Sequence, residues 1–376
     1  MKVLYVVSDP LTSPKGASVR ISATIEALRS RGDDVEVFQP SVAAGPEADF
    51  LGRMLALRRE VASWLSGRRG DLIQFRGIWE GVPAVHWARA RGVRSVYEAH
   101  GFPSVELEYH YPGLHRRRTL EKIILEERAL LSAVDRVITP SRTGRRFLLM
   151  RGVPAERVDV IPNGVDVNLF SPAIRPAPDA PPYRLVYVGT LSPWQGLATL
   201  VEALHHLRNG PLTELFVIGP TKGVWRRQLL RVARRLKVEP ALRLSGPATQ
   251  PDLVPALRSA HVCLAPLPDD SRNSLQGCCP IKILEYMAAG RPIVASRIAP
   301  VEEILEHRSS AYLVRAGSAL ELARGIRFLL ENPAEREALG LQARARAVAE
   351  WTVERFRERV AGFMESLAGR PAGPVL

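Results

Sequence analysis

The fold class is decided by the stretch Leu185-Val186-Tyr187-Val188-Gly189-Thr190-Leu191-Ser192-Pro193-Trp194-Gln195-Gly196-Leu197. Its first four residues are an apolar, β-prone run, and the Gly, Ser and Pro that follow do not continue a strand. A helical pattern then extends over Gly196–Leu207. A strand that leads through a short loop into a helix is the repeating unit of a parallel sheet. We therefore predict an α/β fold.

The same strand-loop-helix unit recurs along the whole chain. Strands are predicted at Val3–Val7, Val35–Phe38, Leu72–Phe75, Ser95–Tyr97, Arg136–Thr139, Val158–Ile161, Arg184–Val188, Leu215–Ile218, Ala241–Leu244, Val262–Pro266, Pro292–Ala295 and Ala311–Val314. Helices are predicted at Val19–Arg31, Leu55–Leu65, Leu120–Ser132, Gly196–Leu207, Trp225–Leu236, Ile281–Ala289, Ala319–Leu330, Ala334–Glu350 and Val353–Leu367. Alternation of this kind is typical of parallel sheets that helices cover on both faces.

A proline-rich segment separates two sets of strands. The turn signal Pro162-Asn163-Gly164 is followed by Pro172, Pro176, Pro178, Pro181 and Pro182. Proline at this density prevents regular structure. We predict a first domain over residues 1–165, a linker over 166–182 and a second domain over 183–352. Open α/β sheets bind ligands beyond the carboxyl ends of their strands, so two facing sheets place a shared ligand in the cleft between them.

The composition is that of an ordinary globular protein. The chain has 376 residues, of which 46% are apolar and 24% charged, and this mix excludes a disordered or collagen-like chain. The formal charge is +13, from 52 Lys and Arg against 39 Asp and Glu. Because this excess is shared almost equally by the residues up to Val165 and those after it, we attribute it to the solvated surface and expect no nucleic-acid partner.

The cysteines and the apolar runs indicate the cellular compartment of the protein. Cys263, Cys278 and Cys279 have neither a C-x-x-C pair nor metal-ligand spacing, which fits a reducing compartment. The apolar run Val3–Val7 is shorter than the roughly 7–15 residues of a signal core, and no stretch reaches the roughly 18 apolar residues of a membrane span. We expect a cytoplasmic protein.

Two loops have the composition of anion-binding loops. Gly16-Ala17-Ser18 precedes the first helix, where free backbone amides can bind a phosphate or a sugar oxygen. The loop Gly189–Gly196 can hold a diphosphate in the same way. Neither loop has the G-x-G-x-x-G spacing, so an NAD or FAD oxidoreductase is disfavoured.

Lys282 and Glu285 lie three residues apart, on one face near the start of a predicted helix. A lysine there suits a phosphate, and a carboxylate can accept hydrogen bonds from two ribose hydroxyls. The spacing alone favours a simpler interpretation, an exposed ion pair worth only about 0.2–0.5 kcal/mol.

Three segments, in this order along the chain, carry a family likeness. They are Ile161-Pro162-Asn163-Gly164-Val165-Asp166 with Phe170, then Val188-Gly189 to Gly196-Leu197, then Pro280, Lys282 and Glu285-Tyr286-Met287-Ala288-Ala289-Gly290. Together they resemble the retaining glycosyltransferases of the GT4 type (glycosyl transferases group 1). The resemblance implies the GT-B fold, with two Rossmann-like domains facing a central cleft and the C-terminal helix 353–367 packed back on the first domain. It also implies a hexosyltransferase-like enzyme that uses a nucleotide-diphosphate sugar and retains the anomeric configuration.

The resemblance assigns roles to single residues. Glu285 would bind the ribose hydroxyls, and Gly16 with Ala17 would contact the phosphate or sugar of the donor. His100, in Tyr97-Glu98-Ala99-His100-Gly101, matches the histidine that the family places beside the transferred sugar, and it is the catalytic candidate. The donor-binding candidates are Gly16, Ala17, Asn163, Gly189, Thr190, Gln195, Gly196, Cys279, Pro280, Lys282 and Glu285.

The chain departs from the family pattern around the diphosphate. Family members carry an Arg or Lys after the first glycine of the loop and a Lys before the second, and here these positions are Thr190 and Gln195. A second glutamate that faces the donor sugar is replaced by Gly277. Each lost charge-assisted bond is worth roughly 1.5–3 kcal/mol. Two explanations stay open: weak activity, or a different mode of diphosphate binding in which Lys15, Lys282 or Arg272 supplies the charge.

We expect neither a cofactor nor a metal. Asp33-Asp34 and Asp269-Asp270 look like solvated turns, and the eight His are scattered without an H-E-x-x-H motif. No enzyme nucleophile is evident. In the family's retaining scheme the acceptor attacks from the face of the leaving group, and the departing phosphate assists deprotonation of the acceptor hydroxyl.

The acceptor is expected on the first domain. Gly101–Pro112 reads as a long loop whose aromatic and acidic groups suit a sugar, and the acceptor candidates are Phe102, Glu106 and Tyr109. A membrane contact that presents a lipid-linked acceptor is a second interpretation, in which the amphipathic stretch Arg53–Arg69 binds anionic lipid. The basic residues that would assist it are Arg116, Arg117, Arg118, Arg142, Arg145 and Arg146. The alternative is that the apolar residues of this stretch pack inward.

The acceptor class and two other functions stay open. We expect a sugar, lipid-linked or small-molecule acceptor, in the biosynthesis of a glycan, a glycolipid or a glycosylated metabolite. The alternatives are a catalytically weak sugar-nucleotide-binding partner subunit and a sugar-nucleotide epimerase of the same fold.

Overall fold

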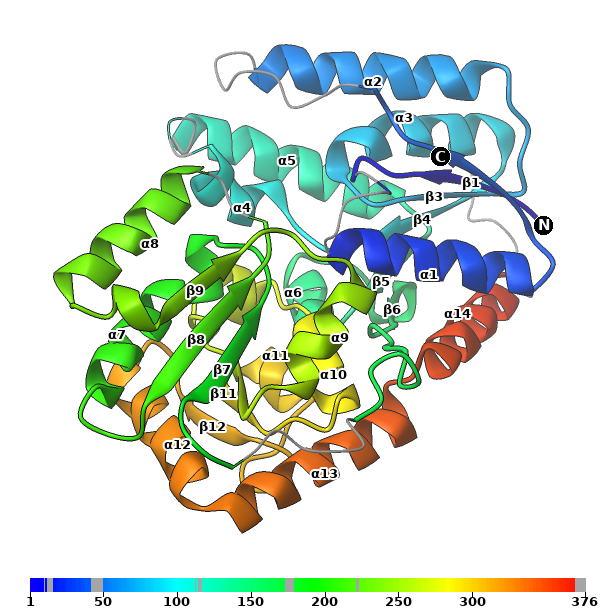
Figure 1. Cartoon of the computed structure of the whole chain (residues 1–376). Coiled ribbons are helices and arrows are strands. Elements are labelled where there is room, and N and C mark those ends of the chain that lie inside the picture. Colours follow the sequence, from blue (N-terminus) through cyan, green and yellow to red (C-terminus); the bar gives the residue numbers. More distant parts are fainter. Residues whose placement is uncertain are drawn as a thin grey trace.

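Each half of the chain forms one parallel sheet of six strands (Figure 1). The computed structural model describes residues 1–9, 11, 16–41, 50–111, 113, 117–172, 179–220 and 223–368. The first sheet has the order β2-β1-β3-β4-β5-β6 and consists of β1 (Lys2–Val6), β2 (Asp34–Phe38), β3 (Leu72–Phe75), β4 (Arg94–Glu98), β5 (Arg136–Thr139) and β6 (Val158–Val160). The second has the order β12-β11-β10-β7-β8-β9 and consists of β7 (Tyr183–Val188), β8 (Thr213–Ile218), β9 (Leu242–Ser245), β10 (Val262–Ala265), β11 (Ile293–Arg297) and β12 (Tyr312–Arg315). The predicted α/β class is confirmed.

Helices cover both faces of each sheet. In the first half they are α1 (Gly16–Ser30), α2 (Phe50–Ser66), α3 (Ile78–Arg91), α4 (Pro103–His110), α5 (Arg117–Ala133) and α6 (Arg142–Met150). In the second half they are α7 (Leu197–Leu207), α8 (Gly223–Arg235), α9 (Gln250–Arg258), α10 (Ile281–Ala288), α11 (Ala299–Glu302), α12 (Ala319–Glu331), α13 (Pro333–Glu350) and α14 (Val353–Ala368). Short turns are η3 (Ala155–Arg157), η4 (Pro193–Gln195), η5 (Glu239–Ala241) and η6 (Ser271–Leu275).

The central strands are apolar because both of their faces are buried. In β1, Val3 and Tyr5 join the core beneath α1 and α14, whereas Leu4 and Val6 join the core beneath α2 and α3. Successive side chains of a strand point to opposite faces, so one continuous apolar run supplies both cores.

Each sheet reverses its strand order beside its first strand. β1 lies between β2 and β3, and β7 lies between β8 and β10. α1, which connects β1 to β2, and α2, which connects β2 to β3, therefore lie on opposite faces of the sheet, and they leave a crevice at the carboxyl ends of the strands. The same holds at β7, so the fold offers two crevices in which a ligand can lie.

The chain returns to the first sheet at its C-terminal helix. α14 packs against α1 (Figure 1), with Phe356, Val360 and Phe363 buried in the same core as Val3 and Tyr5. Where the chain re-enters the first domain, near Thr352, it runs beside the segment at Val165 by which it leaves that domain. The amide of Val165 donates to the carbonyl of Trp351 at 2.8 Å, and the amide of Val353 donates to the carbonyl of Val165 at 3.1 Å.

One predicted loop is wrong. Residues 103–110 form α4, a helix that begins with Pro103 at its first position. Proline is favoured there because it needs no amide partner. The carboxylate of Glu127 on α5 then accepts hydrogen bonds from the amide and the hydroxyl of Ser104, at 2.8 and 2.6 Å. This contact is with a distant part of the chain, so the local sequence pattern did not reveal it.

The amphipathic stretch 53–69 packs inward over part of its length. It lies on α2, where Val61 and Leu65 are buried and the ring of Trp64 stacks on Phe38 with 4.7 Å between centroids. Leu51 and Leu55 are exposed. No described helix is both long and apolar enough to span a bilayer. Lys15, Pro112, Arg116 and residues 173–178 of the predicted linker lie outside the described residues.

Candidate active site

Two joined hollows lie where the carboxyl ends of the two sheets meet. The larger, about 770 Å³, is lined by both halves of the chain, and the smaller, about 280 Å³, lies mainly against the second sheet. They share the lining residues Gly16, Thr190, Gln195, Pro220, Arg272, Cys278 and Ile281. We call the larger hollow the cleft and the smaller one the inner pocket. Both lie where the strand orders predict a ligand.

Glu285 lies at the wall of the inner pocket. Glu285 is 4% exposed, and its Oε1 accepts a hydrogen bond of 2.9 Å from Nε2 of Gln250. Burial raises the pKa of this carboxyl. Among the described residues, Oε2 has no hydrogen-bond partner. A carboxylate in this state is ready to accept hydrogen bonds from ligand hydroxyls.

Lys282, one helical turn earlier on α10, also lines the inner pocket. Its Nζ donates to Oε1 of Gln195 at 2.5 Å and to the hydroxyl of Tyr187 at 3.0 Å. Burial lowers the pKa of Lys282 to about 7. It forms no ion pair with a carboxylate of the described residues, so the exposed Lys282–Glu285 pair favoured by the spacing is wrong. Lys282 thus places its amine beside the loop after β7, with no carboxylate of the described residues within ion-pair distance.

Two glycines shape this loop. Gly189 has a φ of +139°, and a Cβ there would lie 2.8 Å from Nζ of Lys282. Gly196 has a φ of +72° and ends η4, and a Cβ there would collide with the carbonyl of Pro266. Gly196 therefore shapes the turn and does not line either hollow. Thr190 and Gln195 line both of them.

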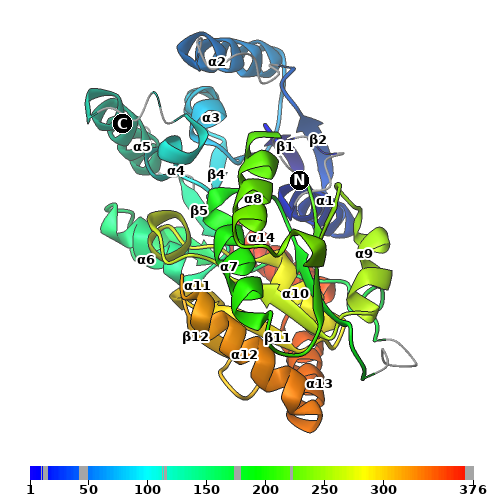
Figure 2. The ribbon, with the colours of Figure 1, turned by 60° about the vertical axis from the view of Figure 1, so that its left-hand side comes forward.

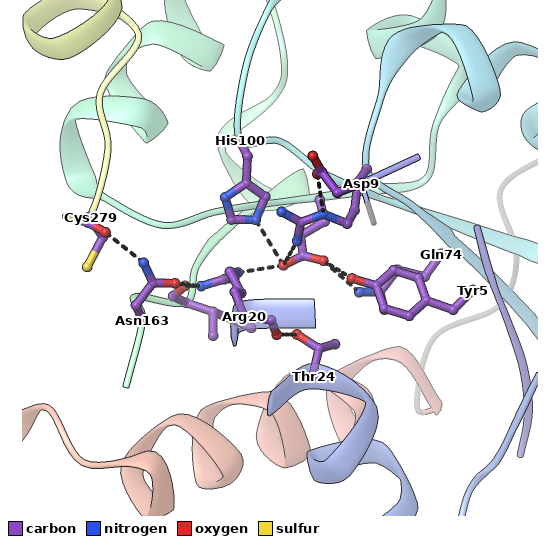
Figure 3. Close-up of polar contacts among 11 residues, drawn as sticks. Tyr5, Asp9, Arg20, Thr24, Gln74, His100, Asn163 and Cys279 are labelled. Atoms are coloured by element: carbon purple, nitrogen blue, oxygen red, sulfur yellow. Dashed lines mark hydrogen bonds and ion pairs between the residues drawn. The ribbon is translucent and has the colours of Figure 1, made fainter. Parts of the chain in front are cut away.

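Asn163 joins the two halves of the chain at the floor of the cleft (Figure 3). Its Oδ1 accepts from Arg20 on α1 at 2.8 Å, and its Nδ2 donates to the carbonyl of Cys279 at 2.6 Å. Pro280, the residue after Cys279, immediately precedes the first turn of α10. Gly16 and Ala17 open α1 on the same floor, and a Cβ on Gly16 would lie 3.3 Å from Cδ1 of Ile281. Asn163 and Cys279 therefore connect the halves of the site.

His100 lies just beyond β4 and lines the cleft. Its Nε2 is 2.9 Å from Oε1 of Glu98, a carboxylate that is itself 1% exposed (Figure 3). Burial and the charges of Arg76 and Arg20 lower the pKa of His100 to about 3. The sequence pattern does not distinguish Glu98, Arg20 and Arg76, because nothing in the spacing of these residues shows that they meet.

The acceptor candidates on and beside α4 have different environments. Phe102 is buried against Phe147 in the core beneath α2 and α3, so its side chain does not line the cleft. Glu106 lines the cleft and pairs with Nε of Arg272 at 3.0 Å. Tyr109 also lines the cleft, with its ring edge-on to Trp194 at 5.5 Å.

Several aromatic residues line the cleft that are not among the site residues expected from the sequence. Phe50 packs against Trp79 and Tyr111, with centroids 6.1 and 4.8 Å apart, on the side of the first sheet. Trp194 and Trp225 belong to the second half. α8, which carries Trp225, lies near α4 in both views (Figures 1 and 2). No group of three or more potential metal-ligating side chains occurs in the part of the chain that the structure describes.

Comparison with known proteins gives two family matches. Residues 182–332 match the family model "Glycosyl transferases group 1", and residues 14–169 match "Glycosyltransferase Family 4". The chain is 26% identical over 389 residues to a D-inositol 3-phosphate glycosyltransferase of Pseudarthrobacter chlorophenolicus, covering 92% of this chain and 90% of that one. It is 27% identical over 261 residues to the amylovoran biosynthesis glycosyltransferase AmsK of Erwinia amylovora, covering 69% of this chain and 63% of that one.

Solved structures resemble the whole chain. The sucrose-phosphate synthase of Thermosynechococcus elongatus has a TM-score of 0.82 at 18% identity, covering 98% of this chain and 99% of that one. The Anabaena protein HepE in complex with UDP-glucose has a TM-score of 0.74 at 20% identity, covering 97% and 100%. These similarities confirm the predicted two-domain fold.

Proposed function

The chain belongs to the glycosyl transferases of group 1 and family 4, and from this premise we propose that it transfers a sugar from a nucleotide-diphosphate donor to an acceptor hydroxyl with retention of anomeric configuration. One observation carries the proposal. Glu285, Lys282 and the loop after β7 surround a single inner pocket that opens into the cleft between the two domains. The predicted GT-B architecture is the setting for this pocket.

The inner pocket suits a nucleotide diphosphate. Glu285 would accept hydrogen bonds from the two ribose hydroxyls, as the family likeness implies. Lys282 and the loop amides that make no backbone hydrogen bond within the described part of the chain, such as that of Thr190, would bind the diphosphate, because an ammonium and free amides both favour anionic oxygen. From the first domain, Gly16 lines both the inner pocket and the cleft, and Ala17 lines the cleft. The structure of the similar protein HepE was solved with UDP-glucose, a donor of this class.

The reaction follows from where charge develops. The bond between the sugar carbon and the diphosphate oxygen breaks, and negative charge grows on the departing phosphate. Lys282 and the loop amides would stabilise that charge. The acceptor oxygen bonds to the same carbon from the face that the phosphate leaves, and its proton passes to the departing phosphate oxygen. This path retains the configuration without an enzyme nucleophile, a cofactor or a metal.

The acceptor would enter the cleft from the side of α4. Glu106 could accept a hydrogen bond from a hydroxyl, and the rings of Tyr109 and Trp194 could pack on the apolar face of a sugar. Phe50 and Tyr111 extend this aromatic surface. An acceptor with at least one sugar ring fits these walls.

A donor screen tests the proposal. We expect one nucleotide-diphosphate sugar to raise the melting temperature, since a ligand at 100 times its Kd stabilises by about 2.7 kcal/mol. With an acceptor panel, the product should have the anomeric configuration of the donor by NMR, and EDTA should not change the rate. An inverted product would contradict retention. Free epimerised sugar nucleotide would indicate the epimerase, and binding without turnover across the panel would indicate the partner subunit.

The pKa of Lys282 predicts how donor affinity depends on pH. In the free protein it is about 7, and a bound diphosphate raises it because the opposite charge favours the ammonium. Above about pH 7 the donor must therefore bind together with a proton, so affinity falls as pH rises, by up to about tenfold per pH unit. Calorimetry near pH 8 in two buffers of different ionisation enthalpy should show proton uptake. The same measurement on Lys282→Gln should show none, and equal uptake in both proteins would contradict the assignment.

A further inference from the structure

A buried carboxylate, Glu98, contacts the ring of His100, whose side chain lines the cleft. It is 1% exposed and ends strand β4. Five side chains converge on it: Tyr5 and Gln74 at Oε2, and Arg20, Arg76 and His100 at Oε1. The distances of Arg20 and His100 from Oε1 are 2.5 and 2.9 Å. Such a number of partners is unusual for one carboxylate and fixes its position.

The ionisation of Glu98 decides which nitrogen of His100 carries the proton. Burial alone would favour the neutral acid, but the charges of Arg76 and Arg20 hold the pKa of Glu98 well below its usual range. An ionised carboxylate only accepts hydrogen bonds. Because Nε2 of His100 is the nitrogen within hydrogen-bond distance, that nitrogen must carry a proton and donate it.

His100 has no second proton near neutral pH. Burial and the same two arginines disfavour the imidazolium. A neutral imidazole that donates from Nε2 has a lone pair on Nδ1. Nδ1 has no hydrogen-bond partner among the described residues, and the His100 side chain, 23% exposed, lines the cleft.

We propose that Glu98 is a positioning residue that holds His100 as the neutral Nε2–H tautomer, so that Nδ1 accepts a hydrogen bond from a hydroxyl of the bound substrate. The tautomer follows from the contacts and charges around Glu98, and the hydroxyl partner rests on the proposed function. His100 then acts as a fixed acceptor and not as a proton shuttle. A substrate whose sugar lacks the hydroxyl opposite Nδ1 would lose this contact.

A purely structural role of Glu98 makes a different prediction. Glu98 also binds Arg20, which holds Asn163 and through it the carbonyl of Cys279. If Glu98 served only this connection between the domains, replacing it would impair the protein equally whether or not His100 were present. The two roles are therefore separable by measuring the coupling between Glu98 and His100.

Nitrogen NMR of the ¹⁵N-His-labelled full chain tests the tautomer without any substrate. The resonance of His100 is identified by its absence from His100→Asn, and the exposed His86 is an internal reference. We expect a protonated Nε2 and an unprotonated Nδ1 from about pH 5.5 to 8, with no titration. A protonated Nδ1, or titration of His100 within this range, would overturn the proposal.

A double-mutant cycle tests the action through His100. We expect Glu98→Asp, which keeps the charge but withdraws the carboxylate, to lower kcat about tenfold in the natural chain and less than about twofold in the His100→Asn background. Equal losses in both backgrounds would assign Glu98 to the structural role and overturn the proposal. If no donor or turnover is found, the proposed function fails, and the NMR measurement still decides the tautomer.

Discussion

Donor binding should be lost when Glu285 is replaced with alanine. The carboxylate would accept two hydrogen bonds from the ribose, and a bond to a charged group is worth about 1.5–3 kcal/mol. Loss of both predicts a decrease in donor affinity of at least about 100-fold. Calorimetric titration with the nucleotide sugar selected by the donor screen measures this directly. Glu302→Ala, which removes an exposed glutamate of α11, is the matched control and should bind normally.

The folded state should tolerate the loss of Glu285. Its pKa is raised in the folded protein, so the folded state binds more protons than the unfolded state between the two pKa values. The stability therefore falls as pH rises through this window, so the titration of this carboxyl is a net cost at higher pH. We expect the melting temperature of Glu285→Gln at pH 7 to equal or exceed that of the natural protein while affinity falls. Full affinity in both variants would contradict the ribose assignment.

The second large effect is expected from exchanging Lys282 and Gln195. Their side chains meet, with Nζ of Lys282 2.5 Å from Oε1 of Gln195. The family likeness places a loop lysine at position 195, and here the ammonium reaches the same place from α10. We expect Lys282→Gln to weaken donor binding about 30-fold, the loss of one charge-assisted bond. Adding Gln195→Lys should restore affinity to within about fivefold, because the charge returns to the same space.

The controls make this exchange decisive. Lys122→Gln removes an exposed lysine of α5 and should not change affinity. Gln195→Lys alone brings two ammonium groups together and should lower stability without improving affinity. If the variant with both Lys282→Gln and Gln195→Lys binds the donor no better than Lys282→Gln alone, a positive charge at this place does not account for donor affinity. If Lys282→Gln keeps full affinity, Arg272 is the next residue to test, since it lines both hollows.

The sequence predicted the order of the elements well and their contacts poorly. The strands at 72–75 and 136–139 have the predicted limits, because apolar runs between turn signals depend on local chemistry. The helix at 103–110 was missed, since Ser104 needs the distant Glu127. The proximity of Lys282 to Gln195, 87 residues earlier, follows from strand order, which a single sequence does not specify. Glu98 lies in the segment 97–101, but its importance depends on Arg20 of α1 and on Arg76 just beyond β3, which that segment does not contain.

The connection between the domains limits how the cleft can open. The chain passes from one domain to the other at Val165 and returns at Thr352, and backbone hydrogen bonds join these two passages. Two crossings held side by side act as a single hinge, because they permit rotation about a line through Val165 and resist sliding or twisting of one domain over the other. The Asn163–Cys279 contact at the cleft floor lies close in sequence to this hinge. We therefore expect the cleft to open by rotation about this connection, which would break the contacts of Glu106 on α4 with Arg272 and Gln276 before those at Val165.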